Sequence, residues 1–250
     1  MNINWLILMP GAFIAAFVDA IAGGGGIISI PAFILSGFPM HYALGTNKFG
    51  MSTGTLISTW RFYKDGKVNF DFLKYLIPCS LIGSVLGVLL VLRLDAEFLK
   101  PLIMVLLIVV GVYSFFSKSV GLVNEYIPIS GLRLIKAMLF ALMLGFYDGF
   151  FGPGTGSFII FGLVRLFKFD YVSASGNSKV LNLTSNLAAL VTFAVNGKII
   201  YLWAIPTALI MMLGGYIGSG IAIKGGAKFV KPVFISMALI AAIKMLIESI

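Results

Sequence analysis

The chain has 250 residues, of which 60% are hydrophobic and 11% are charged, and its formal net charge is +9. A soluble domain uses about 25% charged residues to cover its surface, so lipid must cover most of this chain's exterior. The 18 Lys and Arg residues stand singly or in small groups between apolar runs, which excludes a nucleic-acid-binding patch and is typical of membrane topology signals.

Apolar runs bounded by charges, Gly and Pro predict an all-α, polytopic transmembrane helical bundle. In chain order the first five runs cover residues 3–21, 26–38, 45–60, 72–92 and 98–117. The next five cover residues 132–147, 153–167, 177–195, 201–223 and 229–248. A full crossing needs about 20 residues, so the short second and seventh runs are expected to be broken or re-entrant, with about eight to ten crossings in all. No Lys or Arg precedes the first run, so we expect it to be retained rather than cleaved as a signal peptide.

The two halves of the chain resemble each other at a nearly constant offset. Residues 43–48 read ALGTNK and residues 174–179 read ASGNSK, a shift of 131 residues. The same shift relates residues 66–68 to 197–199, and a shift of 129 residues carries Asp19 and the glycines after it onto Asp148 and its own glycines. So many matches in order indicate a duplication, with a first repeat at 1–117, a connector at 118–131 and a second repeat at 132–250.

Five segments per half give the two repeats opposite orientations, and the basic residues support this. Alternating spans place most of them on one side, as expected when positive charge stays in the cytoplasm. The cytoplasmic set is Arg61, Lys64, Lys67, Lys74, Lys118, Arg133, Lys136, Arg165, Lys168, Lys224, Lys228 and Lys231, and the outer set is Arg93, Lys100 and Lys198. We therefore expect inverted repeats, with both termini facing outward unless the short segments are re-entrant.

Each half carries an acid followed by a glycine cluster. Residues 19–26 read DAIAGGGG and residues 148–157 read DGFFGPGTGS. Each Gly costs a helix about 1 kcal/mol relative to Ala and Pro about 3 kcal/mol, which predicts a break in each half and a short helix after it. The N–H groups at a helix start favour an anion, and glycines let a ligand approach the backbone. The candidate substrate-binding residues are Gly24, Gly25, Gly26, Gly154, Thr155, Gly156 and Ser157; tight helix packing without a ligand is the alternative.

Two lysines stand at equivalent positions near the start of the third segment of each half. They are Lys48, after Asn47, and Lys179, after Ser178. If the breaks meet at a common centre, two lysines and two helix starts converge on one negatively charged group. The alternatives are lysines that snorkel to the headgroup level, or that pair with an intramembrane acid.

Two amides follow Lys179 on the same helix. Asn182 and Asn186 are four residues apart and therefore share a helix face. Such amides bind oxyanion oxygens in a cavity, or they hydrogen-bond between helices.

Two acids lie deep within apolar surroundings. A carboxylate there is costly unless it is paired or protonated, so Asp19 and Asp148 are candidates for proton coupling. A helix cap or a salt bridge to lysine is the alternative. We expect Asp19 with Lys48, and Asp148 with Lys179, to form equivalent pairs that flank one site.

Several of these motifs together resemble the sulfite exporter TauE/SafE family of membrane permeases, over nearly the whole chain. The matching residues are 22–26 (AGGGG) with Pro31, 43–48 (ALGTNK), 152–156 (GPGTG), 178–190 (SKVLNLTSNLAAL) and 196–199 (NGKI). The resemblance implies a carrier of small anions in the inner membrane, often sulfur-containing anions such as sulfite or organosulfonates.

The leading hypothesis is a secondary transporter, acting as an exporter of a small sulfur-containing or related organic anion by alternating access. The alternative is an anion channel or uniporter. An enzyme is disfavoured, because His41, Cys79 and two isolated acids form no nucleophile–base constellation, and we expect no metal and no cofactor. The expected partners are the anion, the lipid bilayer and protons, without nucleic acid, and a homo-oligomer is compatible with the sequence.

Overall fold

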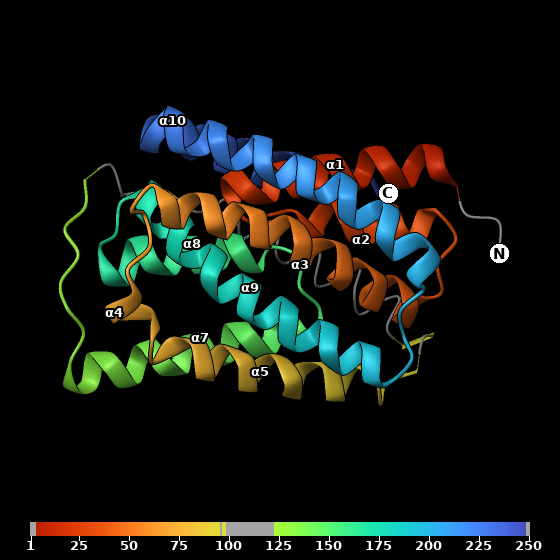
Figure 1. Cartoon of the computed structure of the whole chain (residues 1–250), viewed down its shortest axis with the longest axis horizontal. Helices are drawn as coiled ribbons and strands as arrows, with labels where there is room; N and C mark the ends of the chain where they lie inside the picture. Colours follow the sequence, from red (N-terminus) through yellow and green to blue (C-terminus); the bar gives the residue numbers. More distant parts are fainter. Residues whose placement is uncertain (1–3, 96, 99–122, 249–250) are drawn as a thin grey trace.

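The computed structural model describes residues 4–95, 97, 98 and 123–248, with side chains as far as Gly225 in the last helix. These residues form a helical bundle whose long members lie side by side (Figure 1). The helices are α1 (Trp5–Ala22), α2 (Gly26–Leu35), α3 (Met40–Lys64), α4 (Phe70–Leu73), α5 (Leu76–Val91), α7 (Gly131–Phe150), α8 (Thr155–Phe167), α9 (Tyr171–Val195) and α10 (Tyr201–Glu248). The predicted segment 98–117 lies outside the described residues, apart from residue 98.

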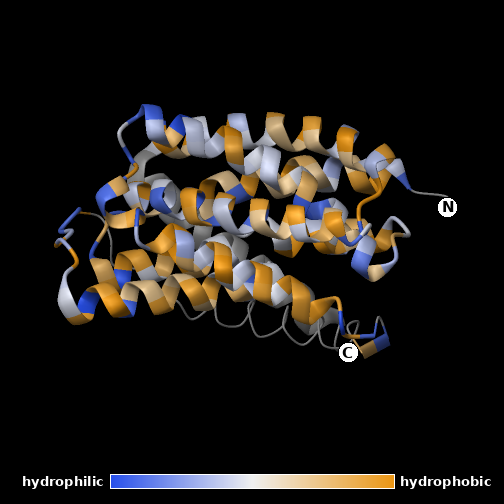
Figure 2. Cartoon of the chain, turned by 60° about the horizontal axis from the view of Figure 1, so that its bottom comes forward, coloured by the Kyte–Doolittle hydropathy of each residue, from blue (hydrophilic) through white to orange (hydrophobic). Residues whose placement is uncertain are grey.

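Hydrophobic residues recur along the helices, and strongly hydrophilic residues gather at the ends of the bundle (Figure 2). Among the described residues, three helices are long and apolar enough to cross a membrane: Trp5–Ala22, Tyr171–Val195 and Tyr201–Gly225. Val191, Val195 and Leu209 leave more than half of their side chains uncovered by protein. Water would oppose such exposure over whole helices, so the chain is a membrane protein with lipid around it.

Glycines let the helices pack closely and show their directions. A Cβ atom at Gly214 would lie 2.5 Å from the carbonyl oxygen of Phe13, and one at Gly218 would lie 2.3 Å from that of Phe17. The residue numbers rise together on the two helices, so α1 and α10 run parallel. Helices α3 and α10 also run parallel, since Gly50 lies against Met211 and Gly54 against Gly215.

Helices α5, α7 and α9 form a second set, which packs in the same way as the first set, α1, α3 and α10. On α5, Gly83 packs against Leu142 and Gly87 against Phe146, so α5 and α7 run parallel. The hydroxyls of Ser80 and Ser84 donate to the carbonyls of Leu181 and Ser185, so α9 runs parallel to them. These contacts involve the residues that the sequence offsets of 129 and 131 match to those in the contacts of α1, α3 and α10.

The two sets run in opposite directions and meet where α3 packs against α9. Gly45 lies near Phe193, and Lys48 bonds to Asn186, so residue numbers rise on one helix as they fall on the other. Helices α1, α3 and α10 therefore point one way, and α7, α9 and α5, which match them by offset, point the other way (Figure 1).

Helices α1 and α2 form a hairpin that turns inside the bundle, and α7 and α8 form another. The N–H of Asn4 donates to the carbonyl of Ser36 at 3.2 Å, so α2 returns to the end at which α1 begins. The N–H of Glu125 donates to the carbonyl of Lys168 at 2.9 Å, which returns α8 to the start of α7. The breaks at both turns are those that the glycine clusters predict.

Several predicted boundaries were wrong. Helix α9 begins at 171 rather than 177, because the Asp170 side chain caps the N–H groups of Val172 and Ser173. Helix α3 begins at 40 rather than 45, directly after Pro39. The predicted segment 72–92 is divided into α4 and α5, and α4 is capped by Asn69. The sequence predicts segments at 201–223 and 229–248; the structure assigns helix throughout Tyr201–Glu248, and its stretch Tyr201–Gly225, long and apolar enough to cross a membrane, agrees with the first of them.

The close packing of α5 against α7 predicts the effect of a side chain at their contact. A Cβ atom at Gly149 would lie 2.0 Å from the backbone oxygen of Ser84, so Gly149→Val must push two backbones apart. We expect this variant to lose about 3 kcal/mol of unfolding free energy in detergent.

The matched control is Gly197→Asn, since Gly197 has φ 65° with nothing within 4 Å of its Cβ position, and Asn tolerates that backbone. Equal stability of the two variants would contradict the packing described here.

Candidate functional site

The two glycine breaks meet at the centre of the bundle. Helix α1 ends at Gly23, whose φ of 75° suits glycine, and the second break contains Gly152 at φ 97°. The backbone N–H of Ser157 donates to the carbonyl of Gly23 at 3.0 Å, and its hydroxyl donates to that of Ala22 at 2.8 Å. A Cβ atom at Gly26 would lie 2.7 Å from Cα of Pro153. The second break can approach this closely because Gly23 and Gly26 have no Cβ atom.

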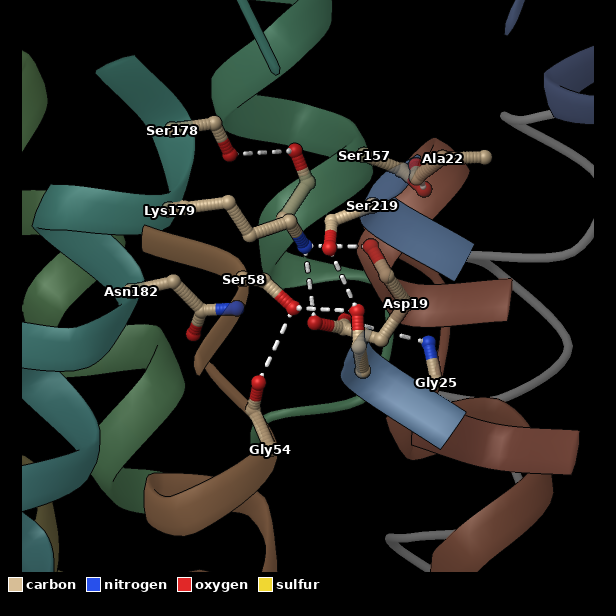
Figure 3. Close-up of polar contacts among 12 residues, drawn as sticks. Asp19, Ala22, Gly25, Gly54, Ser58, Ser157, Ser178, Lys179, Asn182 and Ser219 are labelled. Atoms are coloured by element: carbon tan, nitrogen blue, oxygen red, sulfur yellow. Dashed lines mark hydrogen bonds and ion pairs between the residues drawn. The ribbon is translucent and has the colours of Figure 1, made fainter. Parts of the chain in front are cut away.

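Two buried ion pairs flank this meeting point. Nζ of Lys179 lies 2.7 Å from Oδ2 of Asp19, and Lys179 also donates to the backbone oxygen of Asp19 (Figure 3). Nζ of Lys48 lies 2.8 Å from Oδ2 of Asp148. All four side chains are at most 5% exposed. The lysines therefore neutralise buried acids and do not snorkel to the headgroups.

The pairing predicted from the sequence was wrong, because each acid pairs with the lysine of the other half. The reason is the crossing of α3 and α9. Since they pack against each other in opposite directions, Lys179 reaches α1 and Lys48 reaches α7, so each pair joins one repeat to the other.

Amide groups extend one of the pairs. Nζ of Lys48 donates to Oδ1 of Asn186 at 2.9 Å, and the amide nitrogen of Asn186 donates to Oδ1 of Asn182 at 3.1 Å. The shared helix face that the sequence predicts for the two Asn residues is thus turned toward Lys48. A cation and two amides side by side are groups that bind oxygen atoms of an anion.

A small cavity lies between the ion pairs, with room for about one water molecule. Eight of the predicted residues line it: Asp19, Gly26, Asn47, Lys48, Asp148, Gly156, Asn182 and Asn186. Because oxyanions are larger than water, the cavity is too small to hold one in this structure.

The other candidates lie beside the cavity without lining it: Gly24, Gly25, Gly154, Thr155, Ser157, Ser178 and Lys179. Most of their hydrogen-bonding groups have protein partners. The Gly25 N–H donates to Asp19 at 3.3 Å, the Thr155 hydroxyl to the Gly152 carbonyl and the Ser178 hydroxyl to the Gly156 carbonyl. Many of the hydrogen-bonding groups in the first turn after each break therefore bond to other protein groups and are not free to bind a ligand.

The sequence reasoning missed three residues that line the cavity: Gly23, Met51 and Gly152. Met51 had a usable signal, since it lies one helical turn after Asn47 and Lys48 and so shares their face. Within the described residues, no three His, Cys, Asp or Glu side chains gather closely enough to hold a metal ion.

Comparison with known proteins identifies the family. The model for "Sulfite exporter TauE/SafE" matches residues 8–245. The chain belongs to the sulfite exporter TauE/SafE family. It is 35% identical over 246 residues to a "Probable membrane transporter protein" of Haemophilus influenzae, covering 97% of this chain and 94% of that one. It is 33% identical to the "Probable membrane transporter protein YfcA" of Escherichia coli K12, covering 97% and 90%.

These TauE/SafE relatives are named as membrane transporters, and this chain is likewise a membrane transporter of that type, not an enzyme. A more distant relative, the "Probable membrane transporter protein YdhB" of Bacillus subtilis, is 23% identical over 218 residues, covering 86% of this chain and 87% of that one. No solved structure matches the chain.

Double-mutant cycles test the crossed pairing. Removing one partner of a buried pair leaves an uncompensated charge, so Asp19→Asn and Lys179→Met are each expected to cost about 3 kcal/mol, and less than the sum when combined. Unfolding in detergent by added SDS measures the free energies.

The control cycle combines Asp19→Asn with Lys48→Met, which are not paired in the structure. We expect its coupling energy to be clearly smaller. The opposite ranking would restore the pairing within each half and contradict the geometry.

Proposed function

We propose that this chain is a secondary transporter that exports a small anion, such as sulfite, thiosulfate, an organosulfonate or a related organic anion, by alternating access. The observation that carries the proposal is the small polar cavity at the junction of the two halves, where Lys48 and two amides lie side by side. A buried cation with neutral donors suits an anion of a few heavy atoms. The name of the family, sulfite exporter, supports the sulfur-containing class and the outward direction.

The charges at the site favour a coupled proton. Two lysines and two carboxylates are neutral together. An anion alone would leave a net negative charge in the bilayer interior, which is costly. A monovalent anion accompanied by one proton on Asp148 keeps the site neutral and frees Lys48 to face the anion, and the outward gradient of the anion then supplies the drive for export.

The helix directions support alternating access by inverted repeats. Helices matched by the sequence offset run in opposite directions, and contacts such as Gly83 with Leu142 and Gly214 with Phe13 recur in both halves. In such an arrangement the site lies between the repeats, and exchanging their conformations opens it to the other side.

The basic residues support a multi-pass protein of the inner membrane, with one end of the bundle in the cytoplasm. Arg61 and Lys64 lie in the last turn of α3, and Arg165 lies in the last turn of α8. Figure 1 places both helix ends at the same end of the bundle, which by the positive-inside rule is the cytoplasmic end.

Proteoliposomes test the proposal. We expect saturable uptake of labelled sulfite or thiosulfate that an imposed proton gradient accelerates, and at least a tenfold lower rate for Lys48→Ala. Conductance that does not saturate would favour the anion channel, and absence of any anion flux would contradict the proposal.

Proton coupling has its own test in Asp148→Asn. Asparagine has the size of aspartate but cannot take up and release a proton, so we expect the anion flux of this variant no longer to respond to the proton gradient. Glu125→Gln, on a non-helical segment at the end of the bundle, serves as the control and should respond like the parent chain. An unchanged gradient response in Asp148→Asn would remove this residue from the coupling.

A further inference from the structure

The two ion pairs are equivalent by sequence offset, but they are not equivalent in their surroundings. Lys48 lines the central cavity, whereas Lys179 is 0% exposed and does not line it. Of these two lysines, Lys48 is therefore the one placed to meet a ligand in the cavity.

The amides beside Lys48 have no counterpart beside Lys179. The offset of 131 residues carries Asn182 and Asn186 back onto Met51 and Thr55. A thioether and a hydroxyl take the place of the two amides, so both halves have a lysine at this position, but the two amides lie beside Lys48 alone.

The pair with Lys179 is closed more completely. Oδ2 of Asp19 accepts from Lys179 at 2.7 Å, and its Oδ1 accepts from the N–H of Gly25 at 3.3 Å. Figure 3 shows Lys179 pointing from α9 toward Asp19, with Ser157 near the same turn. The carboxylate of Asp19 thus has a partner on each oxygen.

A second link holds the same turn to the other half. Ser157 donates through its backbone to Gly23 and through its hydroxyl to Ala22. The offset of 129 residues places Ile28 opposite Ser157, and Ile28 has no hydroxyl to form the equivalent bond at the other break. The first break is therefore bonded to the second half of the chain by both Lys179 and Ser157.

The Lys179 pair lies toward the basic end of the bundle. Three residues before Lys179, Gly176 packs against the backbone of Lys67. Three residues before Lys48, Gly45 packs against the backbone of Lys198 at the opposite end. By the charge rule, the Lys179 pair faces the cytoplasm and the Lys48 pair faces outward.

We propose that the two pairs have divided roles: Lys48, with Asn182 and Asn186, holds the transported anion, while Lys179 and Asp19 form a latch that closes the cavity toward the cytoplasm. The first role rests on the proposed function, since it assigns the anion to one lysine. The second does not, because a latch restricts access to the cavity whatever the cargo.

A binding experiment separates the two pairs. Each is neutralised in full, as Lys48→Met with Asp148→Asn, or Lys179→Met with Asp19→Asn, so that no unpaired charge is left buried. Calorimetric titration of the purified chain with sulfite should show at least tenfold weaker binding for the first double variant and a change within threefold for the second. Asn186→Thr, which introduces the residue found at the equivalent position, should also weaken binding severalfold.

A labelling experiment tests the latch without any substrate. In a chain with Cys79→Ala and Met51→Cys, a charged thiol reagent is added to either face of membrane vesicles. Removing the Lys179 pair should raise the labelling rate at least tenfold from the cytoplasmic face, whereas removing the Lys48 pair should leave the cytoplasmic labelling rate unchanged.

The outcomes are distinct. Equal loss of sulfite binding in both double variants overturns the division of roles while the proposed function stands. Absence of sulfite binding by the parent chain contradicts the proposed function, and with it the role of Lys48. Cytoplasmic labelling that does not change when the Lys179 pair is removed overturns the latch.

Discussion

The structure depends on two carboxylates that lie in the interior of a lipid-covered bundle and must be neutralised there. Each is neutralised by a lysine from the other half, at 2.7 Å for Asp19 and 2.8 Å for Asp148. Breaking either pair would leave a charge where neither water nor lipid can stabilise it, so the halves cannot separate without cost. The same constraint underlies the proton coupling that we propose, because protonation of the carboxylate would release the lysine that it holds.

Glycine makes this arrangement sterically feasible. The lysines reach across only because α3 and α9 pack closely, and the breaks meet only because Gly23 and Gly26 present bare backbone. The glycines on α5 and α10 likewise allow close packing farther from the centre, where α5 contacts α7 and α10 contacts α1. Close packing, broken helices and crossed ion pairs are thus three consequences of one composition rich in small residues.

Much of this was readable from the sequence, and the failures have physical reasons. Hydrophobic length predicted the membrane bundle, and glycine clusters predicted the breaks after Asp19 and Asp148. The partner of each lysine was not predictable, because offsets show which residues are equivalent but not which repeat a side chain reaches. The starts of α3 and α9 were misplaced because their polar turns face protein rather than lipid, and hydropathy does not distinguish these surroundings. The asymmetry at Met51 was visible in the sequence but acquires meaning only beside the cavity.

The central claim is that one lysine at the meeting point of the two halves holds the anion. The most direct measurement is anomalous X-ray diffraction from crystals grown with selenite, the selenium analogue of sulfite. The account predicts a selenium peak in the central cavity with an oxyanion oxygen about 2.7–3.2 Å from Nζ of Lys48 and beside the Asn186 amide. A peak beside Lys179 with Lys48 still paired to Asp148, or peaks only at the ends of the bundle, would contradict it.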